Sequence, residues 1–197
     1  MNANTALLIV DPYNDFISEG GKIWPYVREV AERIGLIDNM RRLVDAARAR
    51  GMQIVFVPHH QFDDGDLEGW KFLNPTHAAA RRIRPFVRGS WGAEFHPDFQ
   101  RRAEDLVAQE HWLHNGFAAT DLDYLLRQRG IDHLVICGMR ANTCIEATAR
   151  AAVELGYHVT MVRDATACPK WEELQATMEL NAPLFAHAVV TTEALVS

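Results

Sequence analysis

The sequence predicts an α/β fold in which one domain, residues 1–197, forms three α/β/α layers around a mostly parallel sheet. First, short β-branched and aliphatic runs alternate with segments of helical periodicity along the chain. Parallel strands need crossover connections that bury both sheet faces, so this alternation favours a parallel sheet. Second, 197 residues suffice for one sizeable core, and no stretch has the composition of a linker.

Five apolar runs predict buried strands, and a sixth is a weaker candidate. The five runs cover residues 6–10, 53–57, 133–137, 158–162 and 188–191, and the weaker one covers 105–110. Between the first two strands, apolar residues recur near helical spacing from Val27 to Ala47, and Gly51 supplies a stop. Further helices are predicted around residues 121–129, 144–155 and 171–184.

The charge, hydropathy and cysteine content of the chain argue against several classes of binding partner and metal site. The chain has 20 basic and 26 acidic side chains, a formal net charge of −6, and no long basic run, which argues against binding to nucleic acid or anionic membranes. No apolar stretch approaches the roughly 20 residues of a membrane helix. Three cysteines without CxxC spacing suggest neither a disulfide framework nor a thiolate zinc site. We therefore expect a cytoplasmic protein that acts on a small molecule without a metal or cofactor.

Residues that follow strands form the shortlist for a site, because ligands of parallel sheets bind beyond the carboxyl ends of the strands. The shortlist comprises Asp11, His59, His60, His111 and the segment 138–144.

Cys144 is the candidate nucleophile of this shortlist. Thr143 and Glu146 have the spacing of a capping box, which places Cys144 in the first turn of a helix. The positive helix end would lower the thiol pKa there, and its N–H groups could hold an oxyanion. The alternative is a buried, unreactive cysteine, which is the expectation for Cys137 inside its strand. Cys168 precedes Pro169 in a predicted loop without an evident partner.

Asp11 ends the first strand and breaks its apolar run with a charge. A carboxylate at that edge could take the thiol proton and later deliver it to a leaving group. Taken alone, an aspartate before Pro12 is as often a turn residue, so its role depends on Cys144.

Four ordered motifs carry a resemblance over nearly the whole chain. They are LLIVDPYNDF at 7–16, GFAATDLD at 116–123, NTCIEATAR at 142–150 and VRDA at 162–165. In them the chain resembles the isochorismatase-like cysteine hydrolases, which are related to nicotinamidases and to carbamoyl-sarcosine and ureidoacrylate amidohydrolases. The resemblance implies a six-stranded Rossmann-like sheet, with Cys144 as nucleophile and Asp11 as acid/base.

The resemblance also implies details of the site. These are a cis peptide between Met139 and Arg140, an oxyanion hole formed by the N–H groups of Arg140 and Cys144, and Phe16 in the pocket wall. Dimers or larger homo-oligomers are common among such proteins. Asn115, inside the matching region, and Trp112, beside His111, are expected to contact substrate.

The chain departs from the family pattern at one catalytic position. The family has a lysine six residues before the position of Phe117, and this chain has His111 there. The three lysines, Lys22, Lys71 and Lys170, lie elsewhere in the sequence. We therefore predict that His111 takes the lysine's place near Asp11 and Cys144. Two further departures, Tyr13 for glutamine and Ala141 for threonine, concern the substrate more than the fold.

The resulting hypothesis is hydrolysis of a small amide, ureido or related acyl substrate through a thioester on Cys144. One alternative is a non-catalytic descendant that binds a small molecule in the inherited pocket. Another is a metal-assisted hydrolase that uses His59 and His60 with nearby carboxylates, namely Asp63, Asp64 and Asp66. The substrate's identity stays open.

Overall fold

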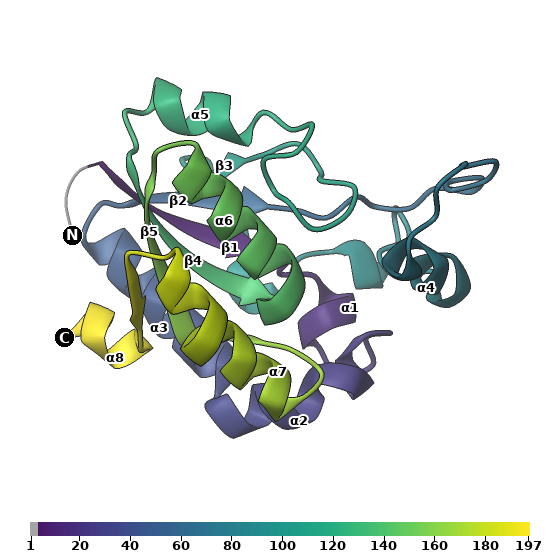
Figure 1. Cartoon of the computed structure of the whole chain (residues 1–197), viewed down its shortest axis with the longest axis horizontal. Helices are drawn as coiled ribbons and strands as arrows, with labels where there is room; N and C mark the ends of the chain where they lie inside the picture. The colour runs from purple at the N-terminus through teal and green to yellow at the C-terminus, as the bar shows by residue number, and fades with distance from the viewer. Residues whose placement is uncertain (1–3) are drawn as a thin grey trace.

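The computed structural model describes residues 4–197, and a six-stranded parallel sheet of order β3-β2-β1-β4-β5-β6 forms its centre (Figure 1). The strands are β1 (Thr5–Val10), β2 (Gln53–Val57), β3 (Leu106–Val107), β4 (His133–Met139), β5 (His158–Ala167) and β6 (Ala188–Val190). Every residue of β1 is buried, as expected for a central strand covered on both faces. The predicted fold class is therefore confirmed.

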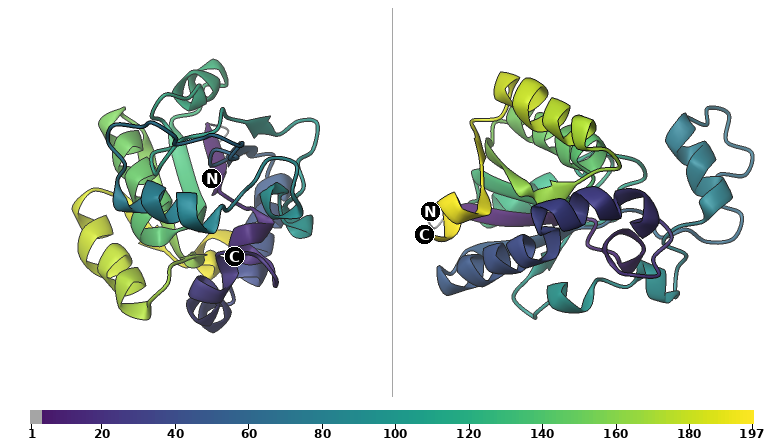
Figure 2. Two further views of the ribbon diagram at one scale, coloured as in Figure 1. Left: turned by 90° about the vertical axis from the view of Figure 1, so that its right-hand side faces the viewer. Right: turned by 90° about the horizontal axis from the view of Figure 1, so that it is seen from below.

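Helices cover both faces of the sheet, as the right-hand view of Figure 2 shows. One layer contains α2 (Trp24–Ile34) and α3 (Leu36–Ala49), with α8 (Thr192–Val196) packed against α3. The opposite layer contains α6 (Glu146–Glu154) and the segment from α7 (Trp171–Gln175) through η4 (Ala176–Asn181) and η5 (Ala182–Leu184). The remaining α-helices are α1 (Asn14–Ile17), α4 (Pro75–Ile83) and α5 (Leu122–Gln128). None of the described helices is both long and apolar enough to cross a membrane.

Several element bounds differ from prediction for local reasons. The helical pattern from Val27 to Ala47 is divided into α2 and α3 because Gly35 adopts a left-handed conformation with φ 66°. Strand β5 continues five residues beyond the predicted end at Val162, through the mixed polar and small-residue segment RDATA, which hydrophobic patterning does not mark. The weak strand at 105–110 is reduced to two residues, followed by an isolated parallel bridge between His59 and His111.

A long excursion, residues 58–105, separates β2 from β3 and includes α4 and the short helices η1 (Trp91–Ala93) and η2 (Pro97–Phe99). It extends beyond the carboxyl end of the sheet, on the right of Figure 1. The buried Asp15 carboxylate ties it to α1 by accepting from the Phe86 N–H at 2.7 Å, and its other oxygen accepts from the Lys22 N–H, between α1 and α2, at 2.9 Å. The excursion therefore helps to enclose the space above the strand ends.

The strand order reverses between β1 and β4, because the chain runs outward from β1 toward β3 and then returns to start the other half at β4. Such a switch point leaves a crevice beyond the carboxyl ends of the two central strands. Gly138 permits their close contact there, since a Cβ on it would lie 2.1 Å from the Val10 carbonyl oxygen. Asp11 and the segment after Met139 open onto this crevice.

Candidate active site

Asp11, His111 and Cys144 converge at the switch point. One carboxylate oxygen of Asp11, one ring nitrogen of His111 and the Sγ of Cys144 all lie within 4.8 Å of one another. Asp11 follows β1, His111 follows β3, and Cys144 lies in the helical turn after β4, so three strand ends supply one residue each. The topology thus brings together three residues that are up to 133 positions apart, the separation from 11 to 144.

His111 and Asp11 form a fully buried pair. The His111 Nε2 lies 3.0 Å from the Asp11 Oδ1, and both side chains have no exposed surface. An ionised carboxylate only accepts hydrogen bonds, so Nε2 is the donor. Within residues 4–197, neither Asp11 Oδ2 nor His111 Nδ1 has a hydrogen-bond partner. Asp11 therefore has one oxygen held by the histidine and a second that is free for proton transfer.

The backbone on both sides fixes His111 in this position. Its N–H donates to the Pro58 carbonyl at 2.9 Å, and its carbonyl accepts from the His60 N–H at 2.8 Å. These bonds extend the β2–β3 pairing by one bridge, past the end of the regular strand. His111 therefore occupies the neighbourhood of Asp11 and Cys144 that the sequence predicted for it.

Cys144 lies in a π-helical turn, η3 (Ala141–Ile145), which leads into α6. Helical backbone begins at Ala141, three residues earlier than predicted, and Arg140 precedes it in an extended conformation. The capping box is wrong: η3 has no side-chain cap, and the Glu146 carboxylate instead pairs with Arg150.

The environment of the Cys144 thiol also differs from expectation. Burial, and then the nearby Asp11 carboxylate, raise its pKa well above the usual range, and these effects outweigh the opposing influence of Thr143 and Arg140. The side chain is 4% exposed. At rest Cys144 is thus a thiol, and a nucleophilic role for its sulfur would require a base to take the proton.

The peptide bond between Met139 and Arg140 is cis, in the position that the family resemblance implied. Arg140 is half-buried beside Cys144 and, among residues 4–197, forms no side-chain hydrogen bond or ion pair. Its guanidinium therefore adds a positive charge to the site without a protein counter-ion.

A cavity of about 370 Å³ opens next to Cys144. Its wall is mostly apolar and includes Phe16, as predicted from the resemblance. Polar groups come from His59, His114, Arg140 and Thr143, while α4 and its flanks supply the far wall. Such a space suits a small organic molecule.

Two predicted substrate contacts are not brought to this cavity. The Trp112 ring stacks on His60, with ring centroids 3.6 Å apart, and is 36% exposed. Neighbouring residues of an extended chain point in opposite directions, so Trp112 faces away when His111 faces Asp11. The Asn115 carboxamide oxygen accepts from the Phe117 N–H at 2.9 Å and stabilises a turn instead.

The metal site suggested around His59 and His60 is not formed by the described residues. Both ring nitrogens of His60 face carboxylates, Asp66 at 2.9 Å and Glu110 at 3.2 Å. His59 Nδ1 lies 3.0 Å from the His60 carbonyl oxygen. The remaining carboxylates form ion pairs with arginines, Asp63 with Arg88 and Asp64 with Arg84.

His59, which was on the shortlist, lies in the cavity wall, and Tyr13 packs behind it. The Tyr13 hydroxyl donates to the His59 carbonyl at 2.8 Å, and the Tyr13 ring stacks on Phe86 with centroids 5.0 Å apart. Tyr13 is fully buried, so its departure from the family pattern changes the packing beneath the cavity.

Burial lowers the pKa of His59 to about 4, against the opposing effect of Asp11. In the unfolded chain, His59 takes up a proton near pH 6.5. The contribution of this group to the free energy of unfolding is therefore fully present above pH 6.5, and it decreases by about 3 kcal/mol as the pH drops toward 4. We expect His59→Gln to lose less stability than the wild type on acidification. Urea unfolding of the wild type and His59→Gln at pH 6.5 and 4.5 measures how much free energy of unfolding each protein loses. Equal losses in the two proteins would contradict a neutral, buried His59.

The raised thiol pKa has its own consequence. Iodoacetamide should label Cys144 slowly at neutral pH and faster as the pH rises, because the thiolate fraction grows. Cys137 and Cys168, whose pKa values burial raises to about 12, line no such cavity and should react later. Peptide mass mapping at several pH values checks both points. Labelling at Cys144 that is already maximal at pH 6 would show a low-pKa thiolate.

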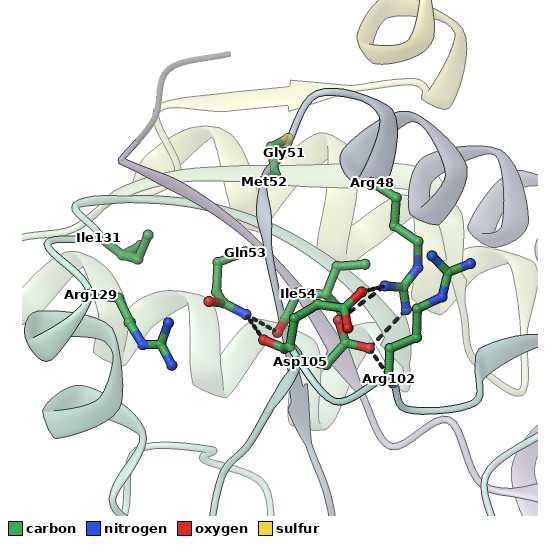
Figure 3. A pocket seen from close by; sticks show the side chains of 10 residues that line it. Arg48, Gly51, Met52, Gln53, Ile54, Arg102, Asp105, Arg129 and Ile131 are labelled. Atoms are coloured by element: carbon green, nitrogen blue, oxygen red, sulfur yellow. Dashed lines mark hydrogen bonds and ion pairs between the residues drawn. The ribbon is translucent and has the colours of Figure 1, made fainter.

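A second cavity, of about 450 Å³, lies at the start of β2, beyond the opposite end of the sheet from Cys144 (Figure 3). Two of its polar side chains already have partners: Arg48 pairs with the Asp105 carboxylate at 2.8 Å, and Gln53 donates to backbone carbonyls. No cysteine or histidine lines it. The Cys144 cavity is therefore the candidate active site.

Comparison with known proteins agrees with this placement. The isochorismatase domain model matches residues 5–194. The ureidoacrylate amidohydrolase RutB of Serratia proteamaculans is 32% identical over 172 residues, covering 82% of this chain and 69% of the relative. A protein of Arabidopsis thaliana named as a probable inactive nicotinamidase is 33% identical, covering 83% and 81%.

A solved structure shares the architecture. The cysteine hydrolase from Pseudomonas syringae pv. phaseolicola has a TM-score of 0.82 at 24% identity, covering 99% of this chain and 92% of that one. With a family model that spans almost the whole chain and relatives above 30% identity, the protein belongs to the isochorismatase family of hydrolases.

Proposed function

We propose that the protein hydrolyses the C–N bond of a small amide or ureido compound through a thioester on Cys144. The convergence of Asp11, His111 and Cys144 within 4.8 Å beside a 370 Å³ cavity carries this proposal. The similarity to an enzyme named as a ureidoacrylate amidohydrolase supports the same reaction class.

The first half of the reaction follows from the free oxygen of Asp11. Oδ2 accepts the thiol proton while His111 holds Oδ1, and the sulfur attacks the substrate carbonyl carbon. The backbone N–H groups of Arg140 and Cys144 stabilise the negative charge that develops on the carbonyl oxygen. Asp11 then gives its proton to the leaving nitrogen as the C–N bond breaks.

The second half reverses these roles. Asp11, again ionised, takes a proton from water, whose oxygen attacks the thioester carbon. The C–S bond breaks, and the proton returns to the sulfur. The products are an acid and an amine, and the resting thiol is restored. No oxidant or external reductant enters the cycle.

The cavity favours substrates with a compact apolar part and an anionic group. Its wall is mostly apolar, and the unpaired Arg140 guanidinium lies beside Cys144. Guanidinium groups bind carboxylates through two parallel hydrogen bonds. We therefore expect an amide that carries a carboxylate to be turned over faster than its neutral analogue.

The alternative function is non-catalytic binding of a similar molecule in the same cavity. The replacement of the family lysine by His111 favours it, as does similarity to a relative named as probably inactive. A binder would hold ligands saturably but form no covalent species.

A panel of small amides and ureido compounds, arranged as carboxylate and neutral pairs, separates the two functions. Release of amine or ammonia is measured, and the intact protein is weighed after rapid acid quench. A mass increase equal to the acyl group, mapped to Cys144, supports the hydrolase. Saturable binding without product or adduct across the panel would overturn it in favour of the binder.

A further inference from the structure

The three residues at the centre of the site also have the side chains of a metal-binding set. Asp11, His111 and Cys144 each offer one ligand atom, and these atoms lie within 4.8 Å of one another. Among residues 4–197, this is the one cluster of three or more potential ligands gathered at such distances. All three side chains are buried, so an ion there would be shielded from bulk water on the protein side.

The geometry fits a small tetrahedral cation. Zinc binds cysteine sulfur at about 2.3 Å and histidine nitrogen or carboxylate oxygen at about 2.0–2.2 Å, which places neighbouring ligand atoms roughly 3–4 Å apart. The Asp11 Oδ1 and His111 Nε2 already lie 3.0 Å apart. The sulfur needs to approach them by at most about 1–2 Å on this estimate, which a change of side-chain torsion can supply.

An orphaned polar atom gives independent support. Asp11 Oδ2 is buried and has no hydrogen-bond partner among the described residues, a costly state for a carboxylate oxygen. A cation beside it would provide the missing interaction. Its charge would also be balanced, since one carboxylate and one thiolate neutralise a divalent ion and limit the cost of burial.

Histidine at position 111 is what makes the set complete. An imidazole nitrogen has a lone pair for a metal, whereas the ammonium of a lysine in this place would have none. To bind through Nε2, His111 must carry its proton on Nδ1, which has no acceptor among the described residues. Histidine ligands usually have such an acceptor, and its absence weakens binding by about 10–100-fold. The site should therefore bind Zn²⁺ with lower affinity than a structural zinc site does.

We infer that Asp11, His111 and Cys144 bind Zn²⁺, with the fourth position of the ion facing the cavity next to Cys144. Bound zinc holds the Cys144 sulfur as a ligand and occupies the base Asp11, so it inhibits hydrolysis reversibly. The inhibitory part of this inference rests on the proposed function, whereas the binding part does not.

Cobalt titration of the full-length protein tests binding without any substrate. Protein freed of metal with a chelator is titrated with Co²⁺, and the near-ultraviolet absorption of a cobalt–thiolate bond is recorded. We expect one equivalent to produce this absorption and Zn²⁺ to displace it. The His111→Lys variant gives Asp11 a cationic partner but lacks the imidazole ligand, so Co²⁺ should bind it more than about 100-fold more weakly. The Cys137→Ala variant, altered at a buried cysteine of β4 that lies outside both the cluster and the cavity, should bind Co²⁺ as the wild type does.

Two results would overturn the site: cobalt binding without thiolate absorption, or equal binding by the wild type and His111→Lys. Circular dichroism of the variants shows whether each is folded. If thiolate absorption appears but no amide is hydrolysed, the metal site stands and the hydrolase proposal fails. If amides are hydrolysed but neither cobalt–thiolate absorption nor inhibition by Zn²⁺ is seen, the hydrolase proposal stands and the metal site fails.

Discussion

Replacing Cys144 by alanine should lower kcat/KM on the best amide of the panel by about 10⁴-fold or more, since the acyl group then has no sulfur to which it can transfer. The variant keeps Asp11, His111 and the cavity, so saturable substrate binding should survive. Turnover is followed by product release, and binding by calorimetry. A folded Cys144→Ala variant with near-normal turnover would remove the thioester from the mechanism.

Cys137→Ala is the matched control for this experiment. Cys137 lies in β4 with its Sγ 3.6 Å from the Leu8 carbonyl oxygen, and it is fully buried in the core. Removal of its sulfur creates a small cavity, so we expect a loss of about 1–2 kcal/mol in the free energy of unfolding with little change in kcat. Urea unfolding and the same assay distinguish this pattern from that of Cys144→Ala.

The sequence was sufficient to predict the sheet and the residues at its carboxyl edge. Buried strands are continuous apolar runs, and a charge such as Asp11 that ends one of them marks the edge directly. Parallel pairing then brings Asp11 and His111 together across a hundred residues, because each follows a strand of the same sheet. The family resemblance added the position of the cis peptide at Met139.

Local sequence patterns do not predict the features of the site that depend on tertiary packing. The Cys144 thiol was expected to have a lowered pKa from its helix end, yet burial dominates because side chains from distant segments surround it. That enclosure comes partly from the excursion at 58–105, whose path no local motif specifies. The orientation of Trp112 was equally inaccessible, since it follows from which face of the chain turns toward Asp11.

His111→Ala is expected to combine a large loss of stability with a loss of activity. Asp11 Oδ1 has His111 Nε2 as its hydrogen-bond partner at 3.0 Å, and both side chains are completely buried. Alanine at position 111 would leave a buried carboxylate with no partner for either oxygen, a change that typically costs about 3–5 kcal/mol. The carboxylate would also lose its orientation toward the thiol, and misplacement of about 1 Å can reduce the rate by about 100-fold.

The His111→Lys variant distinguishes a lost charge partner from simple loss of packing. Lysine returns a positive partner to Asp11, so this variant should recover most of both the stability and the rate that His111→Ala loses. Urea unfolding and kcat/KM at neutral pH provide the measurements. A deficit that lysine does not relieve would mean that the imidazole at position 111 contributes by filling space alone.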